Sequence, residues 1–432
     1  MALVAGVDSS TQSCKLVVVD SSTNRIVREA KVNHPSGTEV DPEHWWLALL
    51  QAIEQIGGLA DVSAISIAGQ QHGMVVLDEH GEVIRPALLW NDLRSAPQAQ
   101  QLIDHFGADR LVELTGSLPV ASFTSTKLLW LSENEPENAR RVAAVALPHD
   151  WLSWRLSENY PDLSALATDR SDASGTGYFN GSTGQWLREI LEFCLPNPIR
   201  TPRLIPAGQE LGRVSEKFGP SIPIAGGMGD NAAAAKGLDL KAGDFVISIG
   251  TSGTVFGYAE SASADITGAI AGFANADDGY LPLVCTLNAA RVMEWGASLL
   301  GVDLDSFAEL ALKAPAGAQG VRVIPYLEGE RTPNLPDATA SVLGITLGNG
   351  SRENFARACI EGMLGGLAHG LDVIKDQGHL VKRILLIGGG ARSKAVQQIS
   401  KELFDEEVWV PEPGEYVALG AAKQAAELLK SL

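Results

Sequence analysis

The chain has 432 residues, of which 45% are hydrophobic and 20% are charged. This length exceeds what one hydrophobic core usually organises, so we expect two domains, and the composition argues against a disordered chain. The 33 basic and 52 acidic residues give a formal charge of −19, which argues against nucleic acid and anionic membranes as partners.

No apolar run reaches the ~18 residues expected of a membrane span. The sequence also opens without a basic and apolar leader. We therefore expect a cytoplasmic protein with no membrane partner. The cysteines, Cys14, Cys194, Cys285 and Cys359, are far apart and form no CxxC pair, so core packing is their expected role.

The first predicted element is a β-hairpin. An apolar run at residues 3–7 leads through a polar turn at 8–13 into a second apolar run at 16–19. The same pattern returns at residues 245–249, 250–253 and 254–256. β-branched runs joined by a short Gly/Ser/Thr turn are typical of hairpins in buried sheets. Two such hairpins predict two similar α/β domains.

Helices and strands alternate between these hairpins. Asp41 and Pro42 precede an apolar stripe at helical spacing and predict a helix that ends at Gly57 and Gly58. A strand follows at residues 64–67, and residues 74–90 predict another hairpin that turns at 79–81. A further helix begins near residue 230. We place the boundary after it, which gives domains of residues 1–238 and 239–432.

In the second half, Ser351 caps a predicted helix that contains Gly362, Gly365, Gly366 and Gly370. Each glycine weakens a helix by about 1 kcal/mol relative to alanine, so we expect another backbone or a flat ligand close to this helix. A strand at residues 383–387 then leads into a glycine-rich turn and a helix from about 394. The last strand is predicted at 407–410 and the last helix near 415.

Three of the predicted turns suit phosphate. Residues 8–13, 250–253 and 388–393 each follow an apolar strand and offer small side chains with exposed amides. Such turns bind phosphate through backbone N–H groups and hydroxyls. None fits GxGxxG or GxxxxGK[ST], so neither a Rossmann site nor a Walker P-loop is indicated. Together the turns favour two facing hairpins that grip one phosphate chain across a cleft.

Two aspartates are candidates for chemistry. Asp8 ends the first strand, where its carboxylate could hold Mg²⁺ or could form an Asx turn. Asp230 follows a run of glycines at the start of a predicted helix, where it is either a catalytic group or an ordinary N-cap.

Polar residues that suit a polyol lie between Gly69 and Gly73. Gln71 and His72 supply hydrogen-bond donors and acceptors at the end of a strand, although a lone histidine is often structural. In a polar loop further on, Glu330 and Arg331 are interpreted as a structural ion pair in preference to substrate ligands.

At these positions the sequence resembles a known family. The blocks at residues 6–11, 67–73, 89–92, 227–233, 248–253 and 387–393 are similar, in order, to those of the FGGY carbohydrate kinases, most of all the bacterial xylulokinases. Residues 123–131 resemble the first family signature. Residues 344–361 resemble the second, from which Cys359 departs. Ser9 and Ser10 also depart, because many members carry a glycine in that turn.

The resemblance implies an α/β fold of two ribonuclease-H-like domains, as in actin, hexokinase and Hsp70, with a ligand cleft between them. It implies transfer of the γ-phosphate of ATP, with Mg²⁺, to O5 of D-xylulose. Ribulose, gluconate and glycerol remain alternative acceptors. A nucleotide switch of the same superfold is the alternative from another class. A nicotinamide dehydrogenase is disfavoured by the missing fingerprint.

The resemblance also assigns roles by position. Asp230 matches the general base and Asp8 the magnesium-side carboxylate. Gln71, His72 and Asn231 match the sugar-binding residues. The phosphate and nucleotide turns are matched by Thr11, Gly250, Thr251, Gly388, Gly389 and Ala391. A homodimer is compatible with the family, but no dimer contacts are inherited from it.

Overall fold

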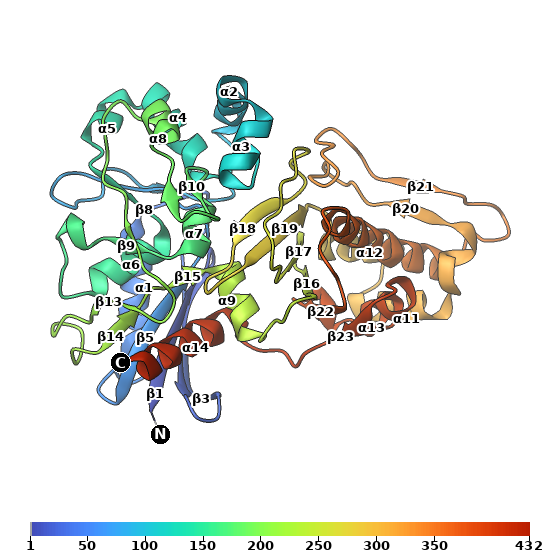
Figure 1. Ribbon diagram of the computed structural model, residues 1–432. Coiled ribbons are helices and arrows are strands. Elements are labelled where there is room, and N and C mark those ends of the chain that lie inside the picture. Colours follow the sequence, from blue (N-terminus) through green and yellow to red (C-terminus); the bar gives the residue numbers. More distant parts are fainter. Residues whose placement is uncertain (1) are drawn as a thin grey trace. The chain divides into compact units, whose positions relative to one another are not determined.

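The computed structural model describes residues 2–432, which form two compact units (Figure 1). Unit 1 contains the chain up to Asp239 together with Phe273–Tyr280 and Glu415–Leu432. Unit 2 contains Leu240–Gly272 and Leu281–Gly414. No helix in the described residues combines the length and apolar character that crossing a membrane requires.

Unit 1 is built on a seven-stranded sheet with the order β13-β14-β5-β1-β2-β3, and β15 pairs with β5. Its strands are β1 (Leu3–Ser9), β2 (Ser13–Asp20), β3 (Arg25–Asn33), β5 (Val62–Gly69), β13 (Glu210–Arg213), β14 (Pro223–Ala225) and β15 (Met228–Gly229). β1, β2 and β3 are antiparallel neighbours, whereas β5 runs parallel to β1. The predicted first hairpin is therefore present as β1 and β2.

Both faces of this sheet are covered, because alternate residues of a strand point to opposite sides. Ala5 and Val7 of β1 pack in one cluster with Trp45 of α1 (Pro42–Gln55), whose N-cap is the predicted Asp41. Val4 packs in another cluster with Ala418 of α14 (Tyr416–Ser431). The sheet is therefore a buried central layer.

The remaining elements of unit 1 surround this layer. They are β4 (Glu39–Val40), β6 (Val75–Leu77), β7 (Ala87–Leu88), α2 (Ala96–Phe106), α3 (Ala108–Thr115), α4 (Thr124–Asn134), α5 (Pro136–Arg141), β8 (Ala144–Ala146), α6 (Pro148–Leu156), β9 (Ala167–Thr168), α7 (Arg170–Ser174), β10 (Phe179–Asn180), β11 (Gln185–Trp186), α8 (Arg188–Cys194), β12 (Arg203–Leu204) and α9 (Asp230–Gly237).

Unit 2 has a six-stranded sheet with the order β18-β19-β17-β16-β22-β23. Its strands are β16 (Asp244–Ile249), β17 (Gly253–Gly257), β18 (Ala271–Ala274), β19 (Tyr280–Thr286), β22 (Arg383–Ile387) and β23 (Glu407–Trp409). The second half of β18 and the first residue of β19 belong to residues 273–280, which cluster with unit 1. The helices are α10 (Ala290–Leu300), α11 (Leu304–Lys313), α12 (Arg352–Asp376) and α13 (Lys394–Leu403), and a separate pair is formed by β20 (Arg322–Ile324) and β21 (Ser341–Leu343). The second predicted hairpin is β16 and β17, and Ser351 caps α12 as expected.

Residues 74–90 turn back at 79–81 as predicted, but their two arms do not form a continuous ladder with each other. β6 pairs with β8, β7 pairs with β4, and only isolated bridges such as Met74 to Leu88 join the two arms. The turn signal was local, whereas the pairing is set by strands that lie far away in the sequence.

The predicted domain division also differs from the packing. Residues 273–280 and the helix α14 were assigned to the second domain, but they pack with unit 1. Gly420 of α14 lies against the backbone of Ala233 in α9, and Gly6 of β1 lies against Ala418 and Ala422. Bare glycines allow this close approach, and it ties the end of the chain to its beginning.

All four cysteines are free, with three of them buried and Cys285 partly buried, which fits packing roles.

The predicted ion pair of Glu330 with Arg331 is wrong. The Glu330 carboxylate accepts hydrogen bonds from the Leu287 N–H (2.6 Å) and from Asn288 Nδ2 (2.9 Å), and from Arg331 only at its backbone N–H (2.8 Å). It thereby holds the loop that precedes α10.

Candidate functional site

Asp8 lies near the end of β1, opposite Lys15 in the hairpin register. Its side chain is buried, and Oδ1 has no hydrogen-bond partner within the described residues. Burial raises the pKa of Asp8 to about 7. The charge of Lys15 lowers that pKa and the charge of Glu415 raises it. Lys15 itself forms an ion pair with Glu415, so it only partly offsets the charge of Asp8. A buried carboxylate with an unused oxygen is poised to receive a ligand.

Asp230 is the first residue of α9, so it lies one position after the N-cap. Gly229 occupies the N-cap position, so the alternative interpretation of Asp230 as an N-cap is wrong. Burial, followed by the negative charge of Asp8, raises the pKa of Asp230 to about 7. Its Oδ1 accepts from the backbone N–H (2.7 Å) and from Nδ2 (3.0 Å) of Asn231. A carboxylate with this pKa can take up a proton near neutral pH.

The sugar-side residues predicted from the sequence lie next to this carboxylate. Asn231 Nδ2 also donates to Gln71 Oε1 at 3.1 Å, so Gln71, Asn231 and Asp230 form one connected chain of polar groups. A Cβ atom on Gly229 would lie 3.0 Å from the Gln71 side chain. The glycine at position 229 therefore makes room for Gln71, which explains part of the glycine run before Asp230.

His72 follows Gln71 in the sequence, and its ring lies among aromatic side chains. Its Nδ1–H donates to the carbonyl oxygen of Gly175 at 2.6 Å, and its ring stacks on Phe123 with centroids 5.1 Å apart. Phe273 lies 5.5 Å away on a tilted ring. His72 also has a positive φ of 68°, which is uncommon for a residue with a side chain. Several contacts therefore fix the position of this ring.

Thr11 lies in the turn between β1 and β2, but its hydroxyl faces the sugar-side segment. Oγ1 donates to Gln70 Oε1 at 3.0 Å and accepts from Trp90 Nε1 at 2.9 Å. Both hydrogen bonds of the Thr11 hydroxyl are therefore made to side chains of unit 1. The remaining phosphate contact that Thr11 can offer is its backbone N–H.

A separate cavity of about 810 Å³ lies in unit 2. Its rim combines the β16–β17 turn, the turn after β22 and the start of α13. Gly250, Thr251 and Gly389, three of the residues predicted to contact phosphate, line it. Other lining residues include the apolar Met293, Phe307, Ala308 and Leu312 and the polar Arg392, Ser393 and Lys394. An apolar wall beside backbone amides and a helix N-terminus suits a flat ring that carries phosphates.

Two predicted nucleotide-side residues do not line this cavity and instead shape its turn. Gly388 has φ +91°, and a Cβ atom there would lie 2.7 Å from the backbone oxygen of Ile249. Ala391 is buried in the core of unit 2, and its carbonyl oxygen accepts from Gln397 Nε2 at 2.8 Å.

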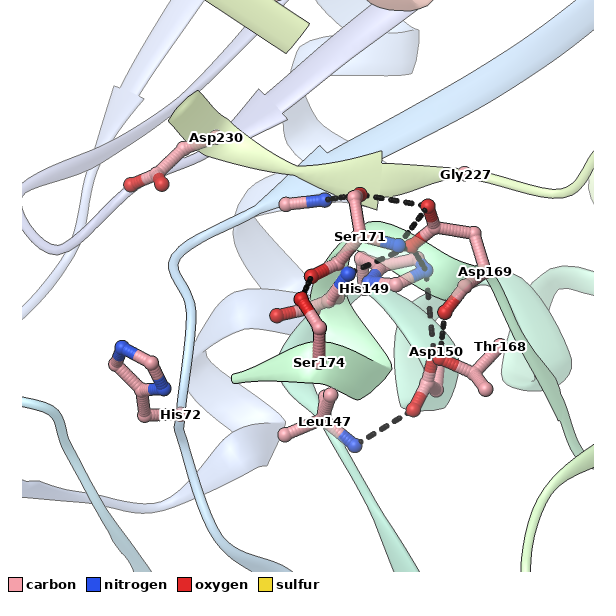
Figure 2. A network of polar contacts seen from close by, with 12 residues as sticks. His72, Leu147, His149, Asp150, Thr168, Asp169, Ser171, Ser174, Gly227 and Asp230 are labelled. Atoms are coloured by element: carbon pink, nitrogen blue, oxygen red, sulfur yellow. Dashed lines mark hydrogen bonds and ion pairs between the residues drawn. The ribbon is translucent and has the colours of Figure 1, made fainter. Parts of the chain in front are cut away.

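A buried charge cluster behind the Asp230 turn was missed by sequence reasoning. His149, Asp150, Asp169 and Asp172 are all buried, and Figure 2 shows the first three of them lying together. His149 Nδ1 lies 2.7 Å from Asp172 Oδ2, and Nε2 lies 3.1 Å from Asp150 Oδ1. Burial lowers the pKa of His149, but the three carboxylates, Asp150 first, raise it more, to about 10. Histidine is therefore the cation of this cluster.

The cluster supports the turn that leads to Asp230. A Cβ atom on Gly227 would meet the His149 ring, and the Gly229 N–H donates to Ser171 Oγ at 3.2 Å. Ser171 in turn donates to Asp169 at 2.6 Å, as Figure 2 shows. In a sequence, charged residues in short polar segments are normally interpreted as solvent-exposed. The burial of this cluster is therefore apparent only from the fold.

Comparison with known proteins decides the family. The N-terminal domain model of the FGGY family of carbohydrate kinases matches residues 3–237, and its C-terminal domain model matches residues 245–428. The chain belongs to the FGGY family of carbohydrate kinases. The predicted resemblance is thereby confirmed, and so is the predicted α/β fold of two ribonuclease-H-like domains.

Individual relatives of this FGGY kinase are similar along nearly its whole length. The xylulose kinase of Streptomyces coelicolor is 45% identical over 438 residues, covering 99% of this chain and 88% of that protein. The xylulose kinase of Escherichia coli is 34% identical, with 97% of this chain and 89% of that protein covered. The crystal structure of xylulose kinase from Bifidobacterium adolescentis matches this chain with a TM-score of 0.94 at 44% identity. The match covers 100% of this chain and 93% of the Bifidobacterium chain.

Proposed function

We propose that this FGGY kinase transfers the γ-phosphate of ATP to O5 of D-xylulose, giving D-xylulose 5-phosphate and ADP. The observation that carries the proposal is the Asp230 carboxylate, which has a pKa of about 7 and is joined through Asn231 to Gln71. A base next to amide groups suits an alcohol acceptor with several hydroxyls. The choice of D-xylulose is supported by relatives at 44–45% identity that are named xylulose kinases.

In the proposed mechanism, Asp230 accepts the proton of the attacking hydroxyl. A carboxylate is a weak base for an alcohol, so the proton moves late, after the loose transition state has begun to charge the attacking oxygen. Gln71 and Asn231 supply amide donors and acceptors to the sugar hydroxyls, and His72 supplies an imidazole. These groups orient O5 for in-line attack.

The nucleotide is proposed to occupy the cavity of unit 2. Its base would lie against the apolar wall that includes Met293 and Phe307, and its phosphates would lie at the turns of Gly250, Thr251 and Gly389. Backbone amides and the N-terminus of α13 favour negative charge there. Such local groups are needed because the chain carries a net charge of −19.

Asp8 is proposed to hold Mg²⁺. The residues fit this ion, because Asp8 Oδ1 is buried and has no hydrogen-bond partner among residues 2–432. No group of three ligating side chains occurs in residues 2–432, which is compatible with a cation that usually keeps waters and binds one or two carboxylates plus substrate phosphates. When bound, Mg²⁺ neutralises phosphate charge during transfer.

The test is ADP release, measured with D-xylulose, ribulose, gluconate, glycerol and no acceptor, with the product identified by ³¹P NMR. We expect the highest kcat/KM with D-xylulose and a phosphate monoester on its O5. A higher kcat/KM with another acceptor would reassign the substrate. ATP turnover that is independent of any acceptor would support a nucleotide switch instead.

A further inference from the structure

Lys127 of α4 is a fully buried lysine that contacts the His72 segment directly. Its Nζ donates to the carbonyl oxygen of His72 at 2.8 Å and to that of Ser122 at 2.7 Å. The hydroxyl of Thr124, at the start of the same helix, donates to the same His72 carbonyl at 3.2 Å. The main chain of His72 is therefore held by two donors from one helix.

The His72 backbone needs such restraint. Its φ of 68° lies in the left-handed region, which is unfavourable for a residue with a Cβ and persists only where the surroundings enforce it. The imidazole ring is held by other contacts, namely the hydrogen bond of Nδ1 to the Gly175 carbonyl oxygen and stacking on Phe123. Phe123 is the residue just before α4, so the start of this helix contacts both the ring and the main chain of His72.

Burying a lysine at this position costs the hydration free energy of its ammonium group, which a residue that only fills space would not lose. Burial lowers the pKa of Lys127 well below its usual range, although the charge of Asp92 opposes this. Both hydrogen-bond partners of Nζ given above are carbonyl oxygens, not carboxylates, so no charge-charge attraction at contact distance offsets the loss of hydration. A methionine or leucine would fill the same volume without that cost. The bonds to the two carbonyls are therefore the feature that distinguishes lysine here.

We propose that Lys127 is a positioning residue for the acceptor sugar, which acts by fixing the left-handed backbone of His72 and so the place of its imidazole. The proposal rests on the proposed contact of His72 with the sugar. It gives a physical role to residues 123–131, the segment that resembles the first family signature.

A double-mutant cycle tests this proposal. Lys127→Met removes both hydrogen bonds and keeps a similar volume, and we expect it to raise the KM for D-xylulose by roughly tenfold, as loss of a buried hydrogen bond does. The KM for ATP should change less than about twofold, since the cavity of unit 2 is untouched. In a His72→Ala background, the same Lys127→Met change should alter the sugar KM by less than about twofold, because the group that it positions is gone.

Thr126→Val is the matched control. Thr126 is buried in the same helix and bonds to Ala121, Phe123 and Ser95, but not to His72. This variant should lower Tm while leaving the sugar KM near that of the wild type. If Lys127→Met does not fold, Thr124→Val serves in its place, because it removes the other donor to the His72 carbonyl.

Two results would overturn the proposal. One is an unchanged sugar KM in folded Lys127→Met or Thr124→Val. The other is an equal rise in sugar KM with and without the His72 side chain, which would indicate general destabilisation. If the acceptor panel shows that wild-type enzyme prefers another sugar, the substrate assignment fails, and the same cycle is measured with that sugar.

Discussion

At the scale of single residues, Asp230 carries the strongest prediction. Asp230→Asn keeps the size of the side chain and an oxygen that can accept from Asn231, but it removes the base. We expect kcat to fall by about 10²–10⁴, the range usual for loss of general base catalysis, with a sugar KM within a few-fold of wild type. Steady-state kinetics and thermal melting check this. Normal turnover per folded molecule would mean that Asp230 is not the base.

The raised pKa of Asp230 predicts a pH dependence of stability. In the folded protein the pKa is about 7, against 3.8 as the ordinary value, so between these values the folded state holds a proton that the unfolded chain has released. The contribution of Asp230 to stability is therefore present at low pH and is lost as pH rises from about 4 to about 7. Asp230→Asn removes this loss.

Urea unfolding at pH 5 and pH 8, with EDTA present, measures the effect. We expect the Asp230→Asn variant to gain stability relative to wild type as pH rises between these values. Asp376→Asn removes one exposed negative charge at the end of α12 and serves as control. If both variants follow the wild-type pH profile, the Asp230 carboxylate does not titrate in this range.

At the scale of elements, the glycines of α12 separate into two kinds. A Cβ atom on Gly362 would run into the carbonyl oxygen of Val323 in β20. Gly365 is exposed, and apart from its own stretch of helix no heavy atom of the described residues would lie within 4 Å of such a Cβ. The expected close backbone is thus present at Gly362, while nothing approaches Gly365. The four glycines look alike in the sequence because their surroundings come from distant strands.

This difference predicts opposite effects of one substitution in one helix. Gly365→Ala should stabilise unit 2 by about 0.5–1 kcal/mol, because alanine restricts the unfolded chain and favours the helix. Gly362→Ala should destabilise it by about 1–3 kcal/mol, because the helix must move away from β20. Denaturant unfolding of both variants gives the free energies directly. The same sign for both changes would contradict this packing.

At the scale of the whole molecule, α14 is the element whose place matters most. Ala418, Ala422 and Ala425 bury the face of the unit 1 sheet that carries Val4 and Val19. Removal of residues 415–432 should expose this face and make unit 1 sensitive to protease. The cavity of unit 2 has no lining residue from that segment, so ADP binding should persist.

Limited proteolysis and calorimetric titration with ADP measure these two properties. Deletion of Leu432 alone, an exposed residue beyond α14, is the matched control and should leave both unchanged. Sugar phosphorylation at a normal rate by the truncated chain would show that unit 1 folds without α14.

The sequence by itself determined the family, the two hairpins and the capped starts of α1 and α12, and it singled out Gly250, Thr251 and Gly389, which line the cavity of unit 2. These features depend on patterns within a few residues, such as β-branched runs, a capping side chain or a glycine-rich turn. Only the tertiary structure decided that β6 pairs with β8, that α14 belongs with unit 1, that Glu330 binds a loop rather than Arg331, and that His149 and Lys127 are buried behind the polar groups of the site. Each of these joins residues that are tens to hundreds of positions apart, and the environment that makes a charge buried or a glycine necessary exists only once those segments have packed together.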